Sequence, residues 1–104
     1  MVREVEGKME TIELSKVLDL VAAPALLESL LQKKGQSVRI NAEQVQRVGA
    51  QCLQILLSAK KAWEADDCNF SLENPSAEFA EAIALMGVSV EDLTYRVQDS
   101  HREE

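Results

Sequence analysis

Residues that carry catalysis or bind cofactors are scarce in this sequence. The 104 residues include one histidine, two cysteines and four aromatic residues. Cys52 and Cys68 form no CxxC pair, so we interpret both as small apolar residues of a core in a reducing compartment. His101 lies in a charged C-terminal stretch, where a lone histidine is rarely a catalyst or ligand. The sequence therefore predicts no metal site.

Long apolar runs and phosphate-binding glycine motifs are also missing. No apolar run approaches the roughly 18 to 20 residues that cross a bilayer. The first ten residues, MVREVEGKME, carry charges where a signal peptide needs an apolar core. Neither GxxxxGK[ST] nor GxGxxG occurs, so nothing indicates a nucleotide cofactor. We expect a cytoplasmic protein with no cofactor and no membrane insertion.

The balance of charge excludes a further class of partner. The formal net charge is −7, and nucleic acid binding needs a basic patch. The adjacent carboxylates Asp66 and Asp67 follow a predicted helix, and Glu103 and Glu104 end the chain. Acid–base catalysis by two carboxyl groups requires a cleft that makes their pKa values differ, and neither pair is placed in such a cleft. We therefore expect no nucleic acid partner and no enzymatic activity.

The pattern that is present predicts one α/β domain. Alternating apolar residues indicate strands at 10–14, 37–41 and 68–72, with a last strand at 93–95. Helical spacing indicates helices beginning near residues 23, 50 and 76. This alternation implies a mixed, mostly parallel sheet of about four strands, with three main helices chiefly on one side. We assign 1–9 to an N-terminal segment or edge strand, 10–97 to the domain and 98–104 to a disordered acidic tail.

The apolar residues of these elements form the predicted core. Residues 15–20 are interpreted as a connector whose Val17, Leu18 and Leu20 pack against the sheet, and Met86 is expected to point inward. The remaining predicted core residues are Ile12, Leu14, Leu26, Leu27, Leu30, Val38, Ile40, Leu53, Leu56, Leu57, Phe70, Leu72, Phe79 and Ile83.

The stretch 46–63 stands out because its helix is apolar around most of its circumference. Only a narrow polar strip remains, at spacings i, i+3, i+7 and i+10. The loop before the helix offers no side-chain chemistry, but the first turn has free backbone N–H groups. We predict that loop and strip together form a protein-binding surface, with these residues: Gln46, Arg47, Gly49, Ala50, Gln51, Gln54, Ser58 and Lys61.

Several strings resemble, in order, those of the STAS domain, the fold of bacterial anti-sigma factor antagonists and of the cytosolic tail of sulfate transporters. They are Val45-Gln46-Arg47-Val48, Gly49-Ala50-Gln51-Cys52-Leu53, Phe70-Ser71-Leu72-Glu73-Asn74-Pro75-Ser76 and Leu85-Met86-Gly87-Val88. The resemblance covers about residues 10–97. It implies a non-catalytic domain that binds proteins.

One departure from the family pattern is informative. In STAS proteins that act as phosphoswitches, an aspartate precedes a serine that a partner kinase phosphorylates. Gly49 and Ala50 occupy these positions here, and alanine has no hydroxyl to accept phosphate. Ser58, two turns on, is not the family's site. The resemblance therefore implies a docking platform without the switch.

The stretch 48–61 also resembles a narrower group, the small single-domain STAS proteins encoded in bacterial chemotaxis operons. This likeness implies an adaptor that docks on a chemotaxis histidine kinase and modulates phosphoryl signalling. Two alternatives remain: a phosphorylation-regulated anti-sigma factor antagonist, and a cytosolic STAS subunit of a lipid-transport ABC complex. An enzyme is the weakest alternative. The oligomeric state and the direction of the effect on the partner stay open.

Overall fold

The computed structural model describes residues 9–97; the segment before them and the tail with His101 lie outside the described residues. The elements, in chain order, are β1 (Glu10–Glu13), β2 (Val17–Leu18), α2 (Ala23–Gln32), β3 (Val38–Asn41), β4 (Arg47–Val48), α3 (Ala50–Ala65), β5 (Phe70–Glu73), α4 (Ala77–Leu85) and the 3₁₀ helix η1 (Val90–Leu93).

Three parallel strands form the main sheet, in the order β1-β3-β5. Their register aligns Ile12, Ile40 and Leu72 across the sheet. Tyr95 adds a single antiparallel bridge to Phe70 in place of the predicted last strand. The short strands β2 and β4 pair in parallel as a separate ribbon. The predicted α/β class with a mostly parallel sheet is confirmed.

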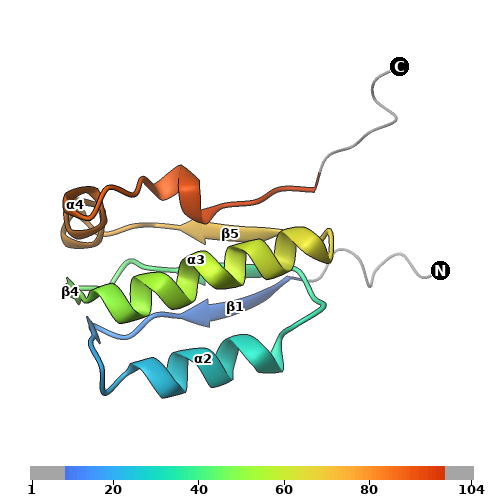
Figure 1. The fold of residues 1–104 in the computed structure, drawn as a ribbon, viewed down its shortest axis with the longest axis horizontal. Helices are drawn as coiled ribbons and strands as arrows, with labels where there is room; N and C mark the ends of the chain where they lie inside the picture. The colour runs from blue at the N-terminus through green and yellow to red at the C-terminus, as the bar shows by residue number, and fades with distance from the viewer. Residues whose placement is uncertain (1–8, 98–104) are drawn as a thin grey trace.

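Helices α2 and α3 lie side by side, with α3 running across one face of the sheet, and α4 lies at the end toward which the strands point (Figure 1). Strands β1 and β3 alternate between buried residues and more exposed ones, and the face opposite α3 carries exposed Thr11 and Arg39. In β5 the polar residue on that face, Ser71, is buried. Most parallel sheets are covered on both faces. Here one face is polar, which explains why the strands could be recognised by alternation.

Specific residues set the helix ends. Ser76 begins α4: its hydroxyl accepts the Phe79 N–H at 3.0 Å and donates to the Val45 carbonyl at 2.6 Å. Gly35 and Gly87 follow α2 and α4 with φ of +87° and +83°, a region that glycine adopts without strain. The Ser76 contacts also hold the link before β4 in place, and this link leads to α3.

Of the fourteen core residues predicted in strands and helices, all but Leu27 and Leu57 are buried. In the connector, Leu18 is buried and Val17 is half-buried. Leu57 is half-buried against the core, whereas Leu27 is exposed because α2 is covered along only part of its apolar stripe. The prediction that Leu20 packs against the sheet is also wrong, because Leu20 lies in the turn before α2 and is largely exposed. Met86 follows the last turn of α4 and is 38% exposed, so it is not part of the buried core as predicted.

Candidate functional site

The loop before α3 is held by backbone hydrogen bonds to the segment around β2. The N–H groups of Gln46 and Arg47 both donate to the Lys16 carbonyl, at 2.7 and 3.2 Å. The Gly49 N–H donates to the Leu18 carbonyl at 2.8 Å. These bonds fix the backbone of the loop, so its exposed side chains are presented by an ordered frame.

Helix α3 begins without a side-chain cap. Gly49 is the N-cap residue, with φ −96° and ψ 165°, and no side chain accepts a hydrogen bond from the first turn. Ala50, the first helical residue, is exposed. The free N–H groups and the positive end of the helix dipole therefore remain available to a carbonyl or carboxylate of another molecule.

All four residues of the predicted polar strip are exposed along α3: Gln51, Gln54, Ser58 and Lys61. Gln46 and Arg47 are exposed as well, and Gly49 is half-buried. The eight residues predicted from sequence therefore lie on one helix and the loop before it. We call the segment Gln46–Ala50 together with the strip the docking surface.

A groove of about 380 Å³ runs beside this surface, between α2 and α3. Gln51, Gln54 and Ser58 form its polar wall. Leu27 and Leu31 of α2 form the opposite wall, and their side chains are 46% and 61% exposed. On its other side the strip borders a second hollow, which Lys60, Lys61 and Asp92 help to line. We call the first of these the α2–α3 groove.

Leu27 and Leu31 are site residues that the sequence analysis missed. Leu27 was assigned to the core, and helical spacing places Leu31 on the same face of α2. Both share the helical stripe that contains the buried Leu26 and Leu30, so helical spacing alone does not separate the exposed leucines from the buried ones.

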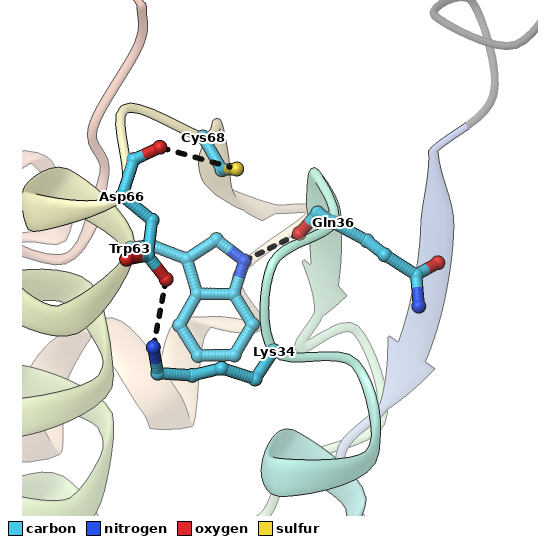
Figure 2. A network of polar contacts seen from close by, with 5 residues as sticks. All are labelled: Lys34, Gln36, Trp63, Asp66 and Cys68. Carbon is cyan, nitrogen blue, oxygen red and sulfur yellow. Dashed lines mark hydrogen bonds and ion pairs between the residues drawn. The ribbon is translucent and has the colours of Figure 1, made fainter.

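Trp63 lies at one end of the α2–α3 groove, in the network that Figure 2 shows. Its indole N–H donates to the Gln36 carbonyl at 2.6 Å. Lys34 runs beside the indole ring and pairs with Asp66 at 2.7 Å. The ring also contacts Phe70 edge-on, with centroids 5.6 Å apart. Trp63 is therefore held by contacts on several sides, and it forms a rigid end of the groove.

Within residues 9–97, two titratable groups have a shifted pKa: Cys52 on α3 and Tyr95, which follows η1. Burial raises the pKa of the Cys52 thiol, and the charge of Asp19 raises it further. The hydrogen bond from the Tyr95 hydroxyl to Asp67, at 2.6 Å, raises the pKa of Tyr95.

Within residues 9–97, no cluster of three His, Cys, Asp or Glu side chains has an arrangement that could hold a metal ion. No helix of this part of the chain is long and apolar enough to cross a membrane.

Comparison with known proteins identifies the family. Searches among curated proteins and among solved structures give no match. A family model described as "Mlab, STAS domain" matches residues 2–95, which is most of the chain and includes the whole docking surface. The parallel sheet with three helices agrees with this match. The chain therefore belongs to the STAS domain family.

Proposed function

We propose that this chain is a non-catalytic signalling adaptor that docks on a chemotaxis-type histidine kinase and modulates phosphoryl signalling. STAS domains mediate protein–protein interactions and are generally non-catalytic, and membership suggests a signalling or anti-sigma antagonist-like role. The observation that carries the proposal is the exposure of the docking surface. Gln46, Arg47 and Ala50 of the loop and all four residues of the strip are exposed, so the surface extends from the loop before α3 to Lys61 in its second half.

The rigidity of the loop supports a binding role. Three backbone hydrogen bonds tie it to Lys16 and Leu18, so little conformational entropy is lost when a partner contacts it. The uncapped start of α3 offers N–H donors, and the amides of Gln51 and Gln54 can both donate and accept. A surface of this kind recognises backbone and polar groups of a protein.

The start of α3 also explains why docking would not be switched by phosphate at the family's position. Ala50 is exposed where a kinase could reach it, but its methyl side chain has no oxygen. Gly49 supplies no carboxylate beside it. The nearest hydroxyl of the docking surface is that of Ser58, which lies more than two turns further along α3. We therefore expect docking that does not depend on phosphorylation of this chain.

The test is a binding measurement with the purified cytosolic chemotaxis histidine kinase of the same organism. The Gln54→Glu, Lys61→Glu double variant places two carboxylates on the strip and should weaken binding at least about tenfold. The matched control is Thr11→Glu, Arg39→Glu, which changes the net charge equally on the open sheet face. Binding that is undiminished in the folded strip variant contradicts the proposal.

Two further experiments separate the alternatives. A subunit of a lipid-transport ABC complex needs no phosphate acceptor either, so it is the second candidate, and co-purification with an ATPase instead of a histidine kinase would select it. A phosphorylation-regulated antagonist would acquire phosphate. Mass spectrometry of the chain after incubation with the kinase and ATP would detect this, and we expect no modification.

A further inference from the structure

Ser76 lies at the start of α4, outside the docking surface, yet it binds the segment that leads into that surface. Its hydroxyl donates to the Val45 carbonyl at 2.6 Å, and its backbone N–H donates to the Ala42 carbonyl at 3.1 Å. Val45 and Ala42 are both buried. Residues 42–46 connect β3 to β4, so Ser76 holds this link at two points from a helix that comes later in the chain.

The link matters because β4 is not part of the main sheet. Strand β4 has two residues and pairs with β2 in a separate ribbon. A short two-stranded ribbon has little stability of its own. Strand β4 also contacts α4, which lies at the same end of the molecule (Figure 1). The position of β4, and of the start of α3 directly after it, therefore depends on the link and on α4.

The Ser76 hydroxyl serves two partners at once. Its oxygen accepts the Phe79 N–H at 3.0 Å and caps α4, while its proton is donated to the Val45 carbonyl. In the part of the chain that the structure describes, this hydroxyl is the one hydrogen-bond donor to that carbonyl. A buried carbonyl that loses its donor destabilises the structure around it. Loss of the proton should therefore loosen the link, whereas loss of the oxygen should loosen α4.

We propose that Ser76 is a positioning residue of the docking surface. Its hydroxyl fixes the link at Val45 and thereby keeps Gln46, Arg47 and Gly49 in the conformation that a partner binds. Ser76 acts through Val45 and does not contact the partner. A site that is already ordered loses less conformational entropy on binding, so the hydroxyl contributes to affinity from outside the interface. The inference rests on the proposed docking function and specifies what holds its surface in place.

Three substitutions at Ser76 separate the two roles of the hydroxyl. Ser76→Asp keeps an acceptor for the Phe79 N–H, because aspartate is as good an N-cap as serine and its charge suits the helix dipole. At neutral pH its carboxylate has no proton to donate to the Val45 carbonyl. Ser76→Thr keeps both the acceptor and the proton, and Ser76→Ala removes both. The three variants therefore predict three different patterns.

The experiment is hydrogen–deuterium exchange of the whole chain, followed residue by residue by NMR. The amides of Gln46, Arg47 and Gly49 donate to carbonyls of the segment around β2. In Ser76→Asp they should exchange at least about tenfold faster than in wild type, while the Phe79 amide keeps its wild-type rate. Ser76→Ala should accelerate both the loop amides and the Phe79 amide, and Ser76→Thr should accelerate neither.

Two controls exclude a general loss of stability. The Leu14 N–H donates to the Asn41 carbonyl at 3.0 Å and reports opening of the main sheet, so its exchange should change less than that of the loop. Ser89→Ala removes the hydroxyl that accepts the Asp92 N–H at the start of η1, and the loop rates should stay unchanged. Unchanged loop rates in Ser76→Asp, equal acceleration of the loop and Leu14, or equally fast loop exchange in Ser76→Thr overturns the proposal.

Binding to the purified cytosolic chemotaxis histidine kinase completes the test. Ser76→Asp and Ser76→Ala should each weaken binding at least about threefold, and Ser76→Thr should restore the wild-type affinity. The two proposals fail in different ways. If the kinase binds all Ser76 variants equally but loses affinity for Gln54→Glu, Lys61→Glu, the docking function stands and the positioning role is wrong. If the kinase does not bind wild type while the exchange rates follow the predicted pattern, the kinase is the wrong partner and the hold of Ser76 on the loop stands.

Discussion

The backbone N–H of Gly49 donates to the Leu18 carbonyl at 2.8 Å, and a Cβ built on Gly49 would meet the same oxygen at 3.4 Å. That separation is an ordinary van der Waals contact, and φ of −96° at Gly49 is open to any residue. The absence of the aspartate that phosphoswitch members carry here is therefore not imposed by the backbone. The position accepts a side chain, and this gives the first prediction.

Gly49→Asp should fold and be slightly more stable than wild type. An aspartate at the N-cap can accept hydrogen bonds from the first turn of α3 and meets the positive end of the helix dipole, a gain of a few tenths to about 1 kcal/mol. Gly49→Ala should move the other way, because alanine is among the poorest N-cap residues. Urea unfolding of the three proteins measures both effects. A clear loss of stability in Gly49→Asp would show that the loop cannot accept the side chain.

Leu56→Ala should destabilise the domain strongly. Leu56 is fully buried on the side of α3 that packs into the core, so truncation removes contacts and leaves a cavity, at a cost of about 2–5 kcal/mol. Leu31→Ala is the control, since Leu31 is exposed and should lose about 0.5 kcal/mol or less. Equal losses in the two variants, by chemical denaturation, would contradict the assignment of Leu31 to the surface.

Trp63→Phe should cost about 1–3 kcal/mol, because it removes the 2.6 Å hydrogen bond to Gln36 and part of a buried ring. Lys34→Ala tests the ion pair with Asp66 beside the same ring. That pair is partly exposed, so its loss should cost about 1 kcal/mol or less. Thermal melts of the two variants measure both losses of stability. A larger loss in Lys34→Ala than in Trp63→Phe would contradict this prediction.

Cys52 should make the folded state less stable at alkaline pH. Burial raises its pKa above the ordinary 9.0, and Asp19 adds to the effect. As pH rises through about 9, the unfolded chain loses the thiol proton while the folded chain keeps it. The unfolded state then binds fewer protons, so the free energy of unfolding falls. Urea midpoints between about pH 8 and pH 10 should fall for wild type and fall less for Cys52→Ala; equal slopes would contradict this origin.

Local periodicity accounts for what the sequence predicted well. The polar strip and the arc containing Leu53, Leu56 and Trp63 lie on one helix, and helical spacing alone decides which residues share a face. The strand alternation was readable because helices cover only one face of the sheet. The N-cap at Ser76 and the glycines after α2 and α4 are local signals of the same kind.

Tertiary contacts account for what the sequence could not predict. Spacing groups Leu27 and Leu31 with Leu26 and Leu30, but it does not say how much of that face a neighbouring element covers. Strands β2 and β4 have two residues each, too few for an alternating pattern. Tyr95 forms an isolated bridge and no strand: it exchanges two backbone hydrogen bonds with Phe70, at 2.7 and 2.8 Å. The α2–α3 groove depends on how two helices pack, which no single segment encodes.

Calorimetric titration of the purified chain with the cytosolic chemotaxis histidine kinase tests the docking surface most directly. We predict measurable binding by wild type, at least about tenfold weaker binding by Gln54→Glu, Lys61→Glu, and unchanged binding by Thr11→Glu, Arg39→Glu. No binding by wild type, or equal affinities for the two double variants, would contradict the account.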